Sequence, residues 1–273
     1  MAIKSFNKVS GDTRGILLNW SAPGGGVYSW YWPAQYAGVA GDLDNAATSL
    51  AAGITAASAS IEAADKQFKQ AGDVARVGAE ACSRYCGPGF RAVRQAAISE
   101  RQTTAAARYS LRQPVEASAT PNSTAVEAIQ RAEIRQTLFR EFGTDLGGAF
   151  EWVMQSQGLD VLQAIVPAID RTIFVKDKQL SDLLAEEFAI RKTIKFTPNE
   201  PSDDFATPAD PLKNKMDDSS IRLLAKAKVG RIKLREEAVD AASKLLVATI
   251  NFTAQSSNLT DTEALNLLFG KSA

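Results

Sequence analysis

Few side chains in this chain of 273 residues could carry out chemistry. Histidine is absent, which excludes Ser-His-Asp and Cys-His nucleophile systems, histidine general bases and histidine-containing metal sites. The two cysteines, Cys82 and Cys86, are four residues apart and would share one face of a helix. A structural zinc ion would need two further ligands, and carboxylates alone would make a poor set. We therefore interpret both thiols as small buried apolar groups. From these residue types we expect no metal, no cofactor and no enzymatic activity.

Two other sequence patterns match those of known functional sites but lack the neighbouring structure that such sites require. Residues 87–92 have the GxGxxA spacing of a dinucleotide-binding loop. An apolar strand should precede such a loop, whereas a segment rich in Ala, Arg and Cys precedes this one, so we interpret it as a corner between two helices. Adjacent acidic pairs point to different faces of a helix or lie near a linker, and solvation explains them. These pairs are Glu186-Glu187, Asp203-Asp204 and Asp217-Asp218.

Arginine is concentrated in one segment, from Ala81 to Val115. This segment contains six arginines, one glutamate and no lysine, so its local charge is +5. Five of the arginines would lie along one stripe of a helix, because they are separated by three, seven, seven and four residues. A guanidinium group suits carboxylate and phosphate oxygens, so we expect a contact with a partner or a second subunit. Nucleic acid and a solvated helix face are the alternatives. The five residues are Arg91, Arg94, Arg101, Arg108 and Arg112.

A second basic run extends from Arg222 to Arg235 and contains no acidic residue. Its charges are distributed around the helix and do not form one stripe. A solvated helix end is the ordinary explanation for such a run.

The segment from Gly15 to Gly41 has no charged residue but contains three of the four tryptophans and three of the five tyrosines. Large rings among glycines and prolines make a poor core element, and Trp and Tyr are enriched at interfaces. We therefore expect a docking interface, with a core patch or a membrane-interface belt as alternatives. Alanine at Trp30 or Trp32 would then weaken association while the isolated chain keeps its stability. The docking residues are Trp20, Tyr28, Trp30, Tyr31, Trp32 and Tyr36.

The elements that must position these residues are almost all helical. Apolar residues recur at helical spacing along most of the chain after residue 41, and β-branched alternating runs are almost absent. Residues 42–70 combine a thin apolar stripe with small neighbours, which suits close packing against another helix, and the spacing within 217–252 fits one long helix. We predict a mainly α fold with little β structure, opened by an irregular or short-stranded segment rich in aromatic residues and glycine. Any strands should be confined to the first forty residues and the linkers. Thr260 and Glu263 match a capping box that begins a last short helix.

Composition divides the chain into four expected parts. An irregular N-terminal segment covers 1–41, a helical core domain covers 42–196, a linker rich in Pro and Asp covers 197–216, and a C-terminal helical segment covers 217–273. Within the core domain we expect the helices to break at 87–89.

A structural or assembly role without catalysis fits these observations best. The formal net charge is zero and the hydrophobic content is 45%, so a core can form and no strong overall attraction to polyanions is built in. In composition the first seventy residues are similar to internal or connector proteins of tailed phages, which makes a virion the expected setting. The expected partners are further copies of the chain or a larger assembly. A helical nucleic-acid-packaging protein that uses the arginine stripe is the alternative. A protein that contacts membrane through 15–61 and an enzyme without histidine are minor alternatives. With two cysteines and no apolar run at the N-terminus, we expect a reducing interior or a virion and no secretory signal.

Overall fold

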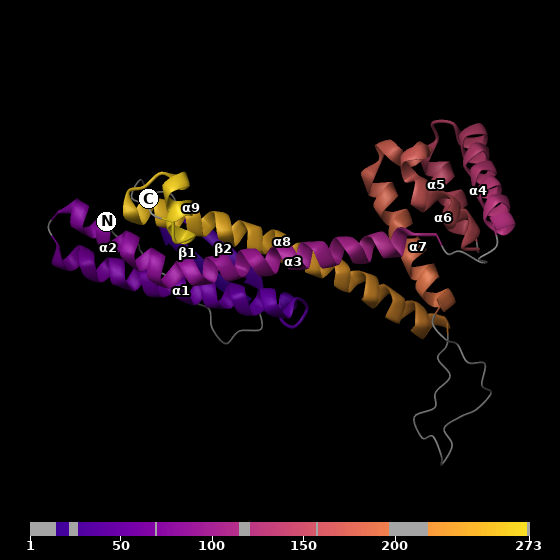
Figure 1. Ribbon diagram of the computed structural model, residues 1–273. Helices are drawn as coiled ribbons and strands as arrows, with labels where there is room; N and C mark the ends of the chain where they lie inside the picture. The colour runs from indigo at the N-terminus through magenta and orange to yellow at the C-terminus, as the bar shows by residue number, and fades with distance from the viewer. Residues whose placement is uncertain are drawn as a thin grey trace, which may run out of the picture. The chain divides into compact units, whose positions relative to one another are not determined.

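The computed structural model describes residues 15–21, 27–68, 70–114, 121–156, 158–196 and 218–271, and it confirms a mainly α fold (Figure 1). Its contacts group the chain into two units. Unit 1 comprises Met1–Ala105 with Lys233–Ala273, and unit 2 comprises Ala106–Ile232. This grouping differs from the four expected parts, because the C-terminal segment shares one hydrophobic core with the N-terminal helices.

Unit 1 begins with a β-hairpin, in the aromatic segment where the sequence predicts irregular or short-stranded structure. Strands β1 (Gly15–Ser21) and β2 (Val27–Pro33) are antiparallel, with Ile16 opposite Trp32 and Leu18 opposite Trp30. The aromatic residues of β2 are good strand formers, which outweighs the neighbouring glycines. A short helix, η1 (Ala34–Tyr36), follows the hairpin.

The helices of unit 1 surround one core of mostly small and aliphatic side chains. Leu50, Ile54 and Ile61 of α1 lie in it, as the predicted apolar stripe requires, together with Ala242 and Phe252 of α8. Helices α3 and α8 continue into unit 2. The long helices are α1 (Gly41–Gln67), α2 (Ala71–Ala81), α3 (Gly87–Arg112) and α8 (Asp218–Ser257), and α9 (Asp261–Leu268) is short.

The helix does not break at 87–89, and the expected corner there is wrong. A π-helical segment, η2 (Cys82–Cys86), joins α2 directly to α3, and the Gly87 amide donates to the carbonyl of Cys82. In an α-helix the ring of Pro88 would clash with the carbonyl four residues earlier. A π turn is wider than an α turn, which relieves that overlap and lets the helix continue.

Glycines let the helices of unit 1 approach closely. A Cβ on Gly53 of α1 would overlap the carbonyl oxygen of Tyr85, and one on Gly89 of α3 would lie 2.9 Å from the Cα of Leu50. Gly89 therefore serves helix packing, and α1 lies against η2. The expectation that the small residues of α1 suit close helix packing is confirmed.

Unit 2 has its own core, built from shorter helices. Leu138, Val153, Leu162, Phe174 and Phe188 are fully buried in it. The expected linker at 197–216 lies outside the described residues. The elements are α4 (Pro121–Phe142), α5 (Leu146–Gln155), α6 (Asp160–Ile165), η3 (Val166–Arg171), η4 (Ile173–Lys176) and α7 (Lys178–Phe196).

Candidate functional site

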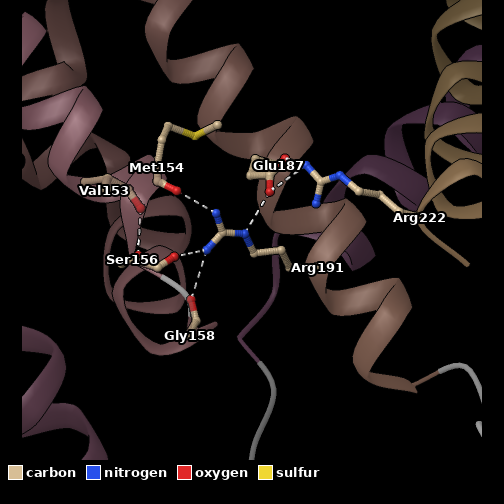
Figure 2. Close-up of polar contacts among 7 residues, drawn as sticks. All are labelled: Val153, Met154, Ser156, Gly158, Glu187, Arg191 and Arg222. Carbon is tan, nitrogen blue, oxygen red and sulfur yellow. Dashed lines mark hydrogen bonds and ion pairs between the residues drawn. The ribbon is translucent and has the colours of Figure 1, made fainter. Parts of the chain in front are cut away.

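An ion cluster links two helices of unit 2. Glu187 of α7 is buried and accepts hydrogen bonds from two arginines (Figure 2). Arg191, one turn later on α7, donates from Nε at 2.7 Å, and Arg222 of α8 donates from Nη2 at 2.7 Å to the other carboxylate oxygen. A buried carboxylate is costly without a partner, so these two guanidinium groups balance its charge.

Arg191 also holds the chain where α5 ends. Its Nη1 and Nη2 groups donate to three carbonyl oxygens that no longer have an intrahelical partner (Figure 2). The guanidinium therefore ties α7 to the connection between α5 and α6. The three carbonyl groups belong to Met154, Ser156 and Gly158.

The same helix contacts the end of α3. Lys192 donates from Nζ to the carbonyls of Ser110 at 2.9 Å and Gln113 at 3.0 Å, and Asp182 pairs with Arg112. A cation at the C-terminus of a helix satisfies its last carbonyls and its dipole. Within unit 2, α7 is thus the element to which the last turn of α3 and the first turns of α8 are bound.

Most described rings of the aromatic segment are core residues, which corrects the expected docking interface. Trp30 is 5% exposed and Trp32 is 2% exposed, and Tyr36 is also buried. Trp30 donates from Nε1 to the carbonyl of Ala241 on α8 at 2.9 Å, and Trp32 donates to Asp44 of α1 at 2.7 Å. Both indole N–H groups have partners, so the rings can be buried without an unsatisfied donor.

Among the six expected docking residues, Tyr31 is the described ring that remains exposed, at 46%. Its neighbours in sequence point to the core because side chains alternate along a strand. The side chains of Trp20 and Tyr28 lie outside the described residues.

A groove lies between β2 and α8 in unit 1, and we call it the β2–α8 groove. Its volume is about 430 Å³. Burial, together with the negative charges of Glu237 and Asp240, raises the pKa of Tyr36 above its ordinary value. Rings from the hairpin side therefore face carboxylates from α8. The groove is lined by Ser29, Trp30, Tyr31, Pro33, Tyr36, Glu237, Asp240, Ala241, Lys244 and Ala248.

The predicted arginine stripe lies on α3, and its members differ in their surroundings. Arg91 donates to the carbonyl of Leu268 at 2.8 Å, and Arg94 lies over the ring of Phe269. Arg101 is exposed and its guanidinium forms no hydrogen bond or ion pair with any described residue. Arg108 and Arg112 lie in the part of α3 that belongs to unit 2. Joint use of the five as one contact surface stays a prediction.

The single acidic residue of this stretch is already engaged. Glu100 is bound by both Nε and Nη2 of Arg235 on α8. This fork pairing raises the pKa of Arg235. The carboxylate of Glu100 is therefore paired with α8, and its negative charge is already counted in the +5 charge of the segment.

Comparison of the chain with family models, curated proteins and solved structures gives no match.

Cys82 and Cys86 are both fully buried, as predicted from their spacing. The hydrogen bond with Cys82, together with burial, holds the pKa of the Cys86 thiol above its ordinary value. Across the described ranges, no three Cys, Asp or Glu side chains gather as ligands for a metal ion. In the same ranges, no helix combines the length and the apolar character that a bilayer span requires.

The ion cluster of Glu187, Arg191 and Arg222 could not be predicted from the sequence. Glu187 and Arg191 are spaced i and i+4, a signal for a helix pair, but nothing in that spacing points to Arg222. From the sequence, Glu187 is interpreted as a solvated member of an acidic pair. The structure corrects this, because Glu187 is buried while Glu186 is exposed.

Proposed function

We propose that this chain is a non-enzymatic structural protein that associates with copies of itself or with a larger assembly. The observation that carries the proposal is the exposed apolar face of α4, where Val126 is 53% exposed and Ile129 is 59% exposed. These residues are three apart and share one helix face, which the unit 2 core leaves uncovered. Large apolar side chains that share one exposed face are a feature of protein interaction sites.

Other helices of unit 2 also carry exposed apolar side chains. Helix α8 has adjacent exposed leucines next to the ion cluster, and the last turn of α3 has an exposed tyrosine. Apolar surface left in water costs free energy that association recovers. These residues are Tyr109, Leu223 and Leu224.

A variant of α4 tests this proposal. Replacing Val126 and Ile129 together with serine should raise the dissociation constant for self-association by about tenfold or more. The same change should alter the chain's own unfolding free energy little, because both side chains are exposed. Size-exclusion chromatography with light scattering measures the association, and thermal unfolding measures the stability.

Replacing Ala125 and Ala128 together with serine provides a matched control. Both residues are exposed on α4, and these substitutions remove no large apolar side chain. Association should be unchanged in that control. A wild-type chain that stays monomeric at all concentrations would contradict the proposal.

The setting we propose is a virion, in which such a chain would be an internal, connector or ejection-type component. The support is the compositional similarity of the first seventy residues to such phage proteins. Because Trp30, Trp32 and Tyr36 are buried in the core, we place the apolar contact area of the proposed assembly on exposed side chains of α3, α4 and α8.

A nucleic-acid-packaging role is the second candidate, favoured by the basic run on α8. Four cations of this run are exposed and form no ion pair with any described residue: Lys226, Lys228, Arg231 and Lys233. Exposed cations neutralise phosphates and release counterions, so binding of nucleic acid should weaken steeply with salt. Tight retention on immobilised heparin, lost when the four are replaced by glutamine, would support this candidate. Weak retention would contradict it.

A further inference from the structure

The β2–α8 groove has the composition of a site for an organic cation. Strand β2 contributes the exposed ring of Tyr31, which lies beside the largely buried rings of Trp30 and Tyr36, while α8 contributes the carboxylates of Glu237 and Asp240. Aromatic faces attract cations, and carboxylates accept hydrogen bonds from them. A volume of about 430 Å³ is in the range of small-ligand pockets.

The carboxylates of the groove are available to a ligand. Neither Glu237 nor Asp240 forms an ion pair with any of the described residues. Both act on Tyr36, whose pKa is raised first by burial and then by their charges. Lys244 also lines the groove and opposes a bound cation, which leaves two negative charges against one positive charge.

The ring positions are held by the fold. The indole N–H of Trp30 donates to the Ala241 carbonyl of α8, and the ring of Trp32 packs 5.2 Å from that of Tyr36 in an edge-on arrangement. Tyr31 is exposed and can lie against an incoming group. The site therefore exists before the ligand arrives, which lowers the entropy cost of binding.

We propose that the β2–α8 groove binds the guanidinium group of Arg101 from a second copy of this chain. A guanidinium group is planar, stacks on aromatic rings and forks onto carboxylates, which an ammonium group cannot do. Arg101 is exposed on an arginine-rich helix, and its guanidinium is unengaged among the described residues, whereas Arg91 and Arg94 have contacts within their own chain. The inference rests on the proposed function, because it assumes self-association.

Sedimentation velocity of the full chain tests the inference with two complementary variants. Glu237→Gln combined with Asp240→Asn removes the charges of the groove at nearly constant shape. Arg101→Gln removes the guanidinium, and Arg101→Lys keeps the charge without the planar fork. We expect the double groove variant and Arg101→Gln each to raise the dissociation constant by about tenfold or more, and Arg101→Lys to restore association only in part.

Mixing gives the decisive measurement. Each variant alone lacks one side of the contact, but the groove variant still offers Arg101 and the Arg101→Gln variant still offers an intact groove. A mixture should therefore associate more tightly than either variant alone.

Lys244→Gln should tighten association of the otherwise unchanged chain, because it removes the positive charge that opposes a bound guanidinium group. Circular dichroism and thermal unfolding of each variant verify that the fold is intact.

The outcomes separate this inference from the proposed function. If the wild-type chain associates and the groove and Arg101 variants associate equally well, the inference is overturned and the proposed function stands. The inference is also overturned, again without loss of the proposed function, if the mixture does not recover association. If the wild-type chain is monomeric at every concentration, both fail.

Discussion

Replacing Trp32 with alanine is expected to lower the unfolding free energy of the chain by about 3–5 kcal/mol, the usual cost of removing a large ring from a core. Trp32 is 2% exposed and packs against Trp30 and Tyr36. Loss of Trp32 would also leave the Asp44 carboxylate without the hydrogen bond that the indole N–H donates to it. Chemical unfolding followed by circular dichroism measures the change.

Tyr31→Ala is the matched control for Trp32→Ala. Tyr31 is the preceding residue along β2 and is about half exposed, so its truncation should cost less than about 1 kcal/mol. The aromatic docking interface expected from the sequence predicts the reverse pattern. Loss of association in Trp32→Ala without loss of stability would restore that interpretation and contradict the burial in the structure.

Replacing Glu187 with alanine is expected to lower the stability of unit 2 by about 2–4 kcal/mol, since breaking a buried ion pair from one side leaves a charge uncompensated. The value lies below that for a fully buried pair because the Arg222 side chain is 41% exposed and Arg191 keeps its carbonyl partners. The change would also place the two guanidinium groups near each other with no anion between them. Chemical unfolding of the full chain measures the loss.

Glu186→Ala provides the control for this cluster. Glu186 precedes Glu187 on α7 but is exposed, so its removal should change stability by no more than about 0.5 kcal/mol. A double-mutant cycle between Glu187 and Arg222 isolates their coupling from other losses. Equal changes in unfolding free energy for Glu187→Ala and Glu186→Ala would show that the ion cluster makes no specific contribution to stability.

The features that the sequence predicts well are local ones. The apolar stripe of α1 repeats at helical spacing, and Thr260 and Glu263 form their capping box through contacts three residues apart. The long helix from about residue 217 is likewise confirmed as α8, because helical periodicity depends on neighbours within two turns.

The features that the sequence does not predict depend on residues far apart along the chain. The indole of Trp30 finds its acceptor at Ala241, 211 residues away, so composition alone could not tell core from interface. Glu187 meets Arg222 across 35 residues. The break expected at 87–89 fails because the π turn at Cys82–Cys86 relieves the cost of Pro88, and because Gly89 of α3 packs closely against Leu50 of α1, a contact between distant residues.

The first and last residues of the π-helical segment are cysteines, and their reactivity can report on unfolding of unit 1. Cys82 and Cys86 are the two cysteines of the chain, both are fully buried, and both belong to unit 1. A thiol-reactive reagent can modify them only when this core opens, so the labelling rate measures the free energy of that opening. Because unit 2 contains no cysteine, its own opening is silent to the reagent. Labelling rates set beside the loss of total helix signal would therefore tell whether the two units unfold together or one at a time.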